Sequence, residues 1–127
     1  MNKSVRTQES LLVVDDVPEV LDGIEELLLT DGYAVDTARS EDRAVESAQR
    51  RPPQIILLNL EGQPEVVIAT ARRIRDRAKL DAVVPIVLFC ADWIAEGEEV
   101  HLGNNVYAIQ PDNFNGLRDF LARLLKF

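Results

Sequence analysis

The chain has 127 residues, 46% of them apolar, and a formal net charge of −8. This length is typical of one domain with a substantial core, spanning residues 1–127 with a polar N-terminal tail over about 1–9. The acidic balance argues against a nucleic-acid partner, because phosphate binding needs clustered positive charge. One cysteine excludes an internal disulfide, and no apolar run approaches the roughly 20 residues of a membrane span. We therefore expect a cytoplasmic protein with no membrane contact.

The first half of the chain alternates between short apolar runs and segments with helical spacing. Residues 11–14 form a continuous apolar run, which is typical of a strand buried on both faces. Pro18 suits the first turn of a helix that ends at a glycine cap, Gly32. The pattern then predicts a strand over 33–38, a helix through 49 with Ser40 as its N-cap, and a strand over 54–60.

The second half continues the alternation. It predicts a helix over 65–79, a strand over 83–90, a shorter helix over 92–101, a turn at 103–105, a strand over 106–109 and a helix over 112–126. Five strands alternating with five helices predict an α/β domain whose parallel sheet is covered on both faces. The arginines between Arg72 and Arg77 indicate a solvated basic face on the third helix.

Polar residues follow the apolar runs at the points where the predicted strands end. Asp15 and Asp16 close the first run, Asn59 closes the third, and Cys90 and Gln110 follow the fourth and fifth. Ligands of doubly wound sheets bind beyond the carboxyl ends of the strands. We therefore expect these five side chains to share one edge of the sheet.

Four segments carry a resemblance to a known family: LLVVDD at 11–16, PQIILLNL at 53–60, VPIVLFCA at 84–91 and VYAIQP at 106–111. By their order and spacing the chain resembles the receiver domain of bacterial two-component response regulators over about residues 9–126. The resemblance implies a flavodoxin-like (βα)5 fold, a doubly wound parallel five-stranded sheet with strand order 2-1-3-4-5.

The resemblance also assigns roles to individual positions. It matches the two magnesium-binding acids to Asp15 and Asp16, and the phosphate-accepting aspartate to Asn59. It matches the hydroxyl residue to Cys90, the lysine to Gln110 and the switching aromatic to Tyr107. Three of these positions depart from the family pattern, because the chain has Asn59, Cys90 and Gln110 where the family has Asp, Ser or Thr, and Lys. It further implies a cis bond between Gln110 and Pro111.

The departures have chemical consequences. A carboxylate can attack a phosphoryl group, whereas the neutral amide of Asn59 has no comparable nucleophile. Gln110 replaces a charged donor with a neutral one, and the two amides could hydrogen-bond directly or through water. The residues therefore predict a vestigial phosphorylation pocket in a pseudo-receiver, which is not an enzyme. No cofactor is required, although Asp15 and Asp16 leave room for weak Mg²⁺ binding.

The predicted function is that of a signalling module in a two-component phosphorelay, acting by protein–protein interaction. The resemblance implies docking through the face of helix 4, strand 5 and helix 5, which here comprises 92–101, Tyr107 and 112–126. The expected partners are a kinase, an output protein or a second copy of the chain.

Two other functions remain open at this stage. The first is a receiver that is phosphorylated with Mg²⁺ on an unorthodox acceptor, Asp15 or Asp16. The second is a flavin- or nucleotide-binding enzyme on the same architecture. The second is disfavoured because such sites use loops rich in Gly, Ser or Thr, and the loop after the first strand is acidic.

Overall fold

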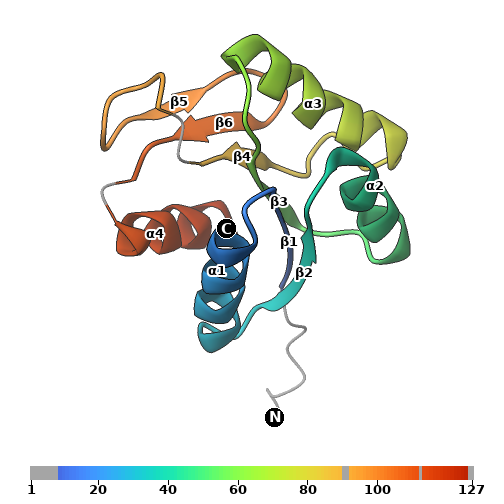
Figure 1. Cartoon of the computed structure of the whole chain (residues 1–127), viewed down its shortest axis with the longest axis horizontal. Coiled ribbons are helices and arrows are strands. Elements are labelled where there is room, and N and C mark those ends of the chain that lie inside the picture. Colours follow the sequence, from blue (N-terminus) through green and yellow to red (C-terminus); the bar gives the residue numbers. More distant parts are fainter. Residues whose placement is uncertain (1–8, 90–91, 112, 126–127) are drawn as a thin grey trace.

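The computed structural model describes residues 9–89, 92–111 and 113–125 (Figure 1). The centre of this part of the chain is a six-stranded sheet in the order β2-β1-β3-β4-β6-β5. All neighbouring strands pair in parallel except the last pair, β6 and β5, which is antiparallel.

Strands and helices follow one another along most of the chain. Their bounds are β1 (Ser10–Asp15), α1 (Pro18–Thr30), β2 (Ala34–Ala38), α2 (Glu41–Arg50), β3 (Ile55–Asn59), α3 (Pro64–Arg77), β4 (Ile86–Leu88), β5 (Glu99–His101), β6 (Val106–Ile109) and α4 (Phe114–Leu125).

The helices cover the two faces of the sheet in pairs. Helices α1 and α4 lie on one face, and α2 and α3 lie on the other (Figure 1). Successive residues of β1 serve the two faces in turn, so Leu11 packs with the α1 and α4 cluster and Leu12 with the α2 and α3 cluster. This double burial explains why the strand reads as an uninterrupted apolar run.

Local sequence signals account for the helix ends in the first half, as predicted. Pro18 occupies the first turn of α1, and Gly32 follows that helix with φ of +95°, a conformation that glycine adopts at little cost. Ser40 caps α2, where its Oγ accepts a hydrogen bond from the Arg43 N–H at 3.3 Å.

The helix predicted over 92–101 is wrong. Gly97 has φ of +87°, which a right-handed helix does not allow, and the described residues after it form β5. The turn at 103–105 was predicted correctly, and all three residues have positive φ. It reverses the chain, so Glu99–His101 pairs antiparallel with β6, and Val100 lies opposite Ala108. The sheet therefore gains an antiparallel sixth strand in place of a helix.

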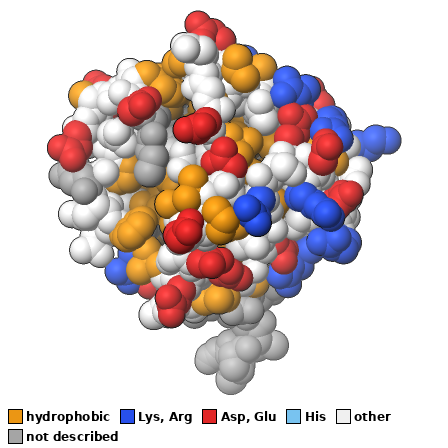
Figure 2. All heavy atoms as spheres, in the orientation of Figure 1, with side chains coloured by type: hydrophobic (Ala, Val, Ile, Leu, Met, Phe, Trp, Pro, Cys, Tyr) orange, Lys and Arg blue, Asp and Glu red, His pale blue; other side chains and the backbone are white. Residues whose placement is uncertain are grey.

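The basic face predicted for α3 is only partly solvated. Arg73 and Arg77 form ion pairs with Glu41 of α2, and Figure 2 shows Lys and Arg side chains gathered on the side of α2 and α3. Arg75, by contrast, is 7% exposed and donates to the carbonyl oxygens of Asn104 at 2.6 Å and Val84 at 2.7 Å. Burial lowers the pKa of this guanidinium, which joins α3 to the turn before β6.

Within the described residues, no helix is both long enough and apolar enough to span a lipid bilayer.

Candidate functional site

The predicted site begins where two central strands end side by side. In the parallel pairing of β1 with β3, Asp15 lies directly opposite Asn59. The preceding residues of both strands are fully buried, which fixes the register, since a slip by one residue would turn each apolar side chain to the other face. The apolar runs therefore bring the acid and the amide together.

Asp15 is fully buried, and both of its carboxylate oxygens accept hydrogen bonds. Oδ1 accepts from the Val17 N–H at 2.8 Å, and Oδ2 accepts from Nδ2 of Asn59 at 3.0 Å. A buried carboxylate needs such donors to offset the loss of hydration. The amide of Asn59 thus supplies a donor at the position that the resemblance matches to an aspartate, which would add a second negative charge.

The other predicted residues lie less close together. Asp16 is exposed and lines a separate hollow with Arg39 and Arg43 between α1 and α2. Gln110 is half-buried, and its backbone continues the pairing with β5, accepting from the Gly97 N–H at 2.6 Å. No direct hydrogen bond joins the Asn59 and Gln110 side chains in the described part of the chain.

Two further expectations concern the residues after β4 and β6. Cys90 lies outside the described residues, so its assigned role stays a prediction. The cis bond implied between Gln110 and Pro111 is wrong, since no peptide bond among the described residues is cis.

A hollow of about 590 Å³ opens beside Asn59. Its walls are the end of β3, the loop before α3, Val67 of α3 and the residues that follow β4. The charged side chains in this lining are Glu61 and Asp92, and no Lys or Arg appears among its described residues. The described lining therefore offers no cation to a phosphoryl group.

Trp93 lies shortly after β4, in the segment predicted as a helix over 92–101. It is half-buried, packs against the cluster under α2 and α3, and also lines the hollow beside Asn59. Sequence reasoning missed this position because it placed Trp93 at the start of a helix that does not form.

The donor set at this edge does not fit Mg²⁺ as it is arranged. Magnesium requires oxygen ligands at about 2.0–2.1 Å, whereas the group that faces Oδ2 of Asp15 is the N–H donor of Asn59. Across the described residues, no three His, Cys, Asp or Glu side chains gather closely enough to hold a metal ion. Weak binding through Asp15 and Asp16 stays a prediction.

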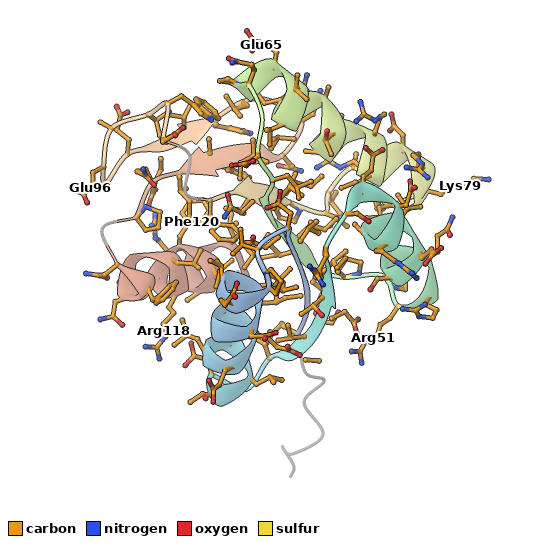
Figure 3. The ribbon with its side chains drawn as sticks, in the orientation of Figure 1. Arg51, Glu65, Lys79, Glu96, Arg118 and Phe120 are labelled. Carbon is orange, nitrogen blue, oxygen red and sulfur yellow. The ribbon has the colours of Figure 1, made fainter. Side chains whose placement is uncertain are left out.

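Tyr107, the predicted switch aromatic, is held on two sides. Its ring stacks on His101 with centroids 4.6 Å apart and meets Phe120 edge-on at 5.8 Å. Phe120, labelled in Figure 3, extends from α4 and is 5% exposed. His101 lies in β5, so the strand that replaces the predicted helix also packs against Tyr107.

Comparison with known proteins supports the architecture. No family model matches the chain, and no curated protein sequence matches it significantly. Among solved structures, the response regulator TrrA of Thermotoga maritima, crystallised with Mg²⁺ and BeF, aligns with a TM-score of 0.70 and 23% identity over 93% of this chain and 100% of its own.

Two further structures agree. The N-terminal domain of a response regulator receiver protein from Methanoculleus marisnigri has a TM-score of 0.63 and 25% identity, covering 95% of this chain and 99% of its own. The chemotaxis protein CheY4 of Vibrio cholerae has a TM-score of 0.67 and 19% identity, covering 94% and 100%. The predicted receiver fold is therefore confirmed.

Proposed function

We propose that this chain, which has the receiver fold, is a signalling module of a two-component phosphorelay that does not accept phosphate. We assign it no enzymatic activity and place its action in the cytoplasm, through contact with other proteins. The observation that carries the proposal is the hydrogen bond from Nδ2 of Asn59 to Oδ2 of Asp15 at 3.0 Å. It puts a neutral donor where phosphoryl transfer needs an anionic nucleophile.

The surroundings of Asn59 support the same conclusion. The described lining of the adjacent hollow contains Glu61 and Asp92 but no cation to meet phosphoryl oxygens. The alternative acceptor Asp15 is fully buried with both oxygens engaged, and Asp16 opens to a different hollow. These contacts favour an inert pocket over an unorthodox acceptor.

The proposed docking face differs from the predicted one. Because 92–101 contains no helix, the face comprises β5, β6 and α4. Tyr107 lies at its centre, between His101 and Phe120. We propose that a kinase or output protein contacts this face and that Tyr107 keeps one orientation, so the surface is presented constitutively rather than on phosphorylation.

Phosphorylation can be tested directly. The chain is incubated with acetyl phosphate and Mg²⁺, and its intact mass is measured with a competent receiver in parallel. The expected result is an adduct on the competent receiver and none on this chain. A stable adduct mapped to Asp15 or Asp16 would establish the alternative function instead.

The Asn59→Asp variant tests the role of the amide. It replaces the donor to Asp15 with a second carboxylate, and we expect a loss of about 2 kcal/mol in the free energy of unfolding without metal, since like charges in contact repel. Added Mg²⁺ should restore part of this loss, because the site then offers more anionic oxygen. Thermal unfolding with and without MgCl₂ measures both effects.

The matched control is Asn113→Asp. Asn113 is exposed, and its side chain accepts from the Gly116 N–H at 3.1 Å, a capping role that aspartate also fills. This variant should change neither the unfolding temperature nor its response to Mg²⁺. A response to Mg²⁺ in the control equal to that of Asn59→Asp would refute the role assigned to Asn59.

A further inference from the structure

Strand β5 forms an open edge of the sheet. It pairs with β6 on one side and is the last strand in the order β2-β1-β3-β4-β6-β5, at the upper left of Figure 1. An edge strand presents unpaired N–H and C=O groups to its surroundings. These groups make the edge a candidate for pairing with another strand.

The backbone hydrogen bonds around β5 show which of its residues face outward. Leu102 donates to the Val106 carbonyl at 2.7 Å, and the Gln110 N–H donates to the Glu98 carbonyl at 3.3 Å. Antiparallel strands alternate between residues that bond to the partner and residues that do not. Val100 therefore directs its backbone groups to β6, and the N–H and C=O groups of Glu99 and His101 point to the free edge.

This edge is complementary to itself. If a second copy pairs antiparallel across a two-fold axis at Val100, Glu99 of each copy lies opposite His101 of the other. Each copy then supplies two N–H and two C=O groups, so every outward group finds a partner. The carboxylate of Glu99 accepts hydrogen bonds, and the imidazole of His101 donates one.

The neighbouring registers lack this match. A shift of the pairing in one direction sets Glu99 opposite Glu99, and like charges directly opposite each other are destabilising. A shift in the other direction sets His101 opposite His101 and leaves both Glu99 residues without an outward partner. The register centred on Val100 is therefore favoured by charge and by hydrogen bonding together.

The flanking residues also accommodate this register. Glu98 would lie opposite Leu102, so no second pair of carboxylates meets. Val100 is half-buried and would face its own copy in a pair without backbone bonds, where side chains approach most closely. Arg123 of α4 holds Glu99 and lowers the pKa of its carboxyl, so the acceptor stays charged.

We propose that a second copy of this chain binds the free edge of β5, with Glu99 opposite His101 across a two-fold axis at Val100, to form a continuous sheet through two molecules. The contact involves few residues, so the dimer is weak and depends on concentration. The proposal is independent of whether Asn59 accepts phosphate, because its readout is the oligomeric state.

Sedimentation equilibrium and hydrogen exchange test the contact on the whole chain. Between about 10 µM and 1 mM protein, the mass should rise from monomer toward dimer, and exchange at the Glu99 and His101 amides should slow by about threefold or more. The Val100 amide is the internal control, since its bond to β6 should give equal protection at all concentrations. A monomer throughout, with unchanged exchange at Glu99 and His101, would overturn the proposal.

Charge exchange tests the register. His101→Glu sets carboxylates opposite each other at both ends and should weaken dimerisation by about tenfold. Adding Glu99→His again sets one carboxylate opposite one imidazole at each end of the contact, and the double variant should recover most of the dimer affinity. Failure of the double variant to recover, with both variants folded by circular dichroism, would exclude this register. Dimerisation unaffected by His101→Glu would place the second copy on another face.

Discussion

The two edge strands of the sheet, β2 and β5, are held in different ways. Strand β2 pairs in parallel with β1 over five residues and lies between α1 and α2. Strand β5 has three residues and pairs antiparallel with β6. Two of its side chains make contacts that hold it, since His101 stacks on Tyr107 and Glu99 forms an ion pair with Arg123. The β2 side thus depends on helix packing, whereas the β5 side depends on a few polar and aromatic contacts.

This difference bears on function. Asp15 and Asn59 end two central strands, β1 and β3, whose register is fixed by burial on both faces. The core therefore fixes the position of the site, although the Asn59 side chain at its centre is neutral. The β5 side, where a helix has given way to a strand, is the part of the surface that differs from the predicted receiver pattern, and it is where we place the contacts with other proteins.

The largest expected effect comes from Arg75→Met. Its guanidinium donates to three carbonyl groups near the start of β4 and β6, those of Val84, Asn104 and Asn105. Loss of these donors leaves partly buried carbonyls without their partner and should cost about 3 kcal/mol of unfolding free energy, measured in urea. Arg72→Met is the control, because Arg72 is exposed and makes one 3.3 Å bond to Leu102. Equal losses in the two variants would contradict the structural role of Arg75.

The glycines Gly103 and Gly32 allow a matched comparison of the two sides. Their φ values are +92° and +95°, and an added Cβ would meet no atom within 4 Å at either position. Alanine should therefore cost about 1–2 kcal/mol at each from backbone strain alone. Gly103→Ala should speed amide hydrogen exchange in β5 more than in β1. Gly32→Ala should not speed exchange in β5 more than in β1. The same exchange pattern in both variants would show that the two sides unfold as one unit.

Glu41 of α2 makes the free energy of unfolding depend on pH. Hydrogen bonds from Arg73, then from Arg77, lower the pKa of this carboxyl from 4.5 to about 2. Its stabilising effect is fully present above about pH 4.5 and is lost as the pH falls toward 2. Glu41→Gln should remove about 0.5–1 kcal/mol at neutral pH, after allowance for solvent screening, and flatten the acid side of the stability curve. Denaturation at pH 7 and pH 3 measures the change, and equal losses at both values would contradict it.

The smallest expected effect comes from His101→Ala. It removes the stacking on Tyr107 and should cost about 0.5 kcal/mol. Because His101 lies in the short edge strand, the change should appear as faster local exchange in β5 and β6 with little change in global unfolding. An unchanged exchange rate at Tyr107 would show that the stack does not hold the strand.

Some features escaped sequence analysis for identifiable reasons. Residues 103–105 lie between two short runs, a pattern that also predicts a hairpin, but the helical reading of 92–101 concealed it. The burial of Arg75 could not be read from helical spacing, because its partners are backbone carbonyls 9 to 30 positions away along the chain. The position of Trp93 in the wall of the hollow beside Asn59 was missed for the same reason, because a helix was predicted over 92–101.

The sequence alone determined the alternating strands and helices and the meeting of Asp15 with Asn59, because uninterrupted apolar runs must be buried on both faces and parallel strands end at one edge. It also determined that the residue closing the third apolar run, Asn59, is neutral. Tertiary structure decided that the Asn59 amide turns its N–H to Asp15, that Asp16 lies apart, and that 99–101 is a strand. These outcomes depend on contacts between groups far apart in the sequence, namely a side-chain hydrogen bond for Asn59 and backbone pairing with β6 for 99–101, and the local pattern does not contain that information.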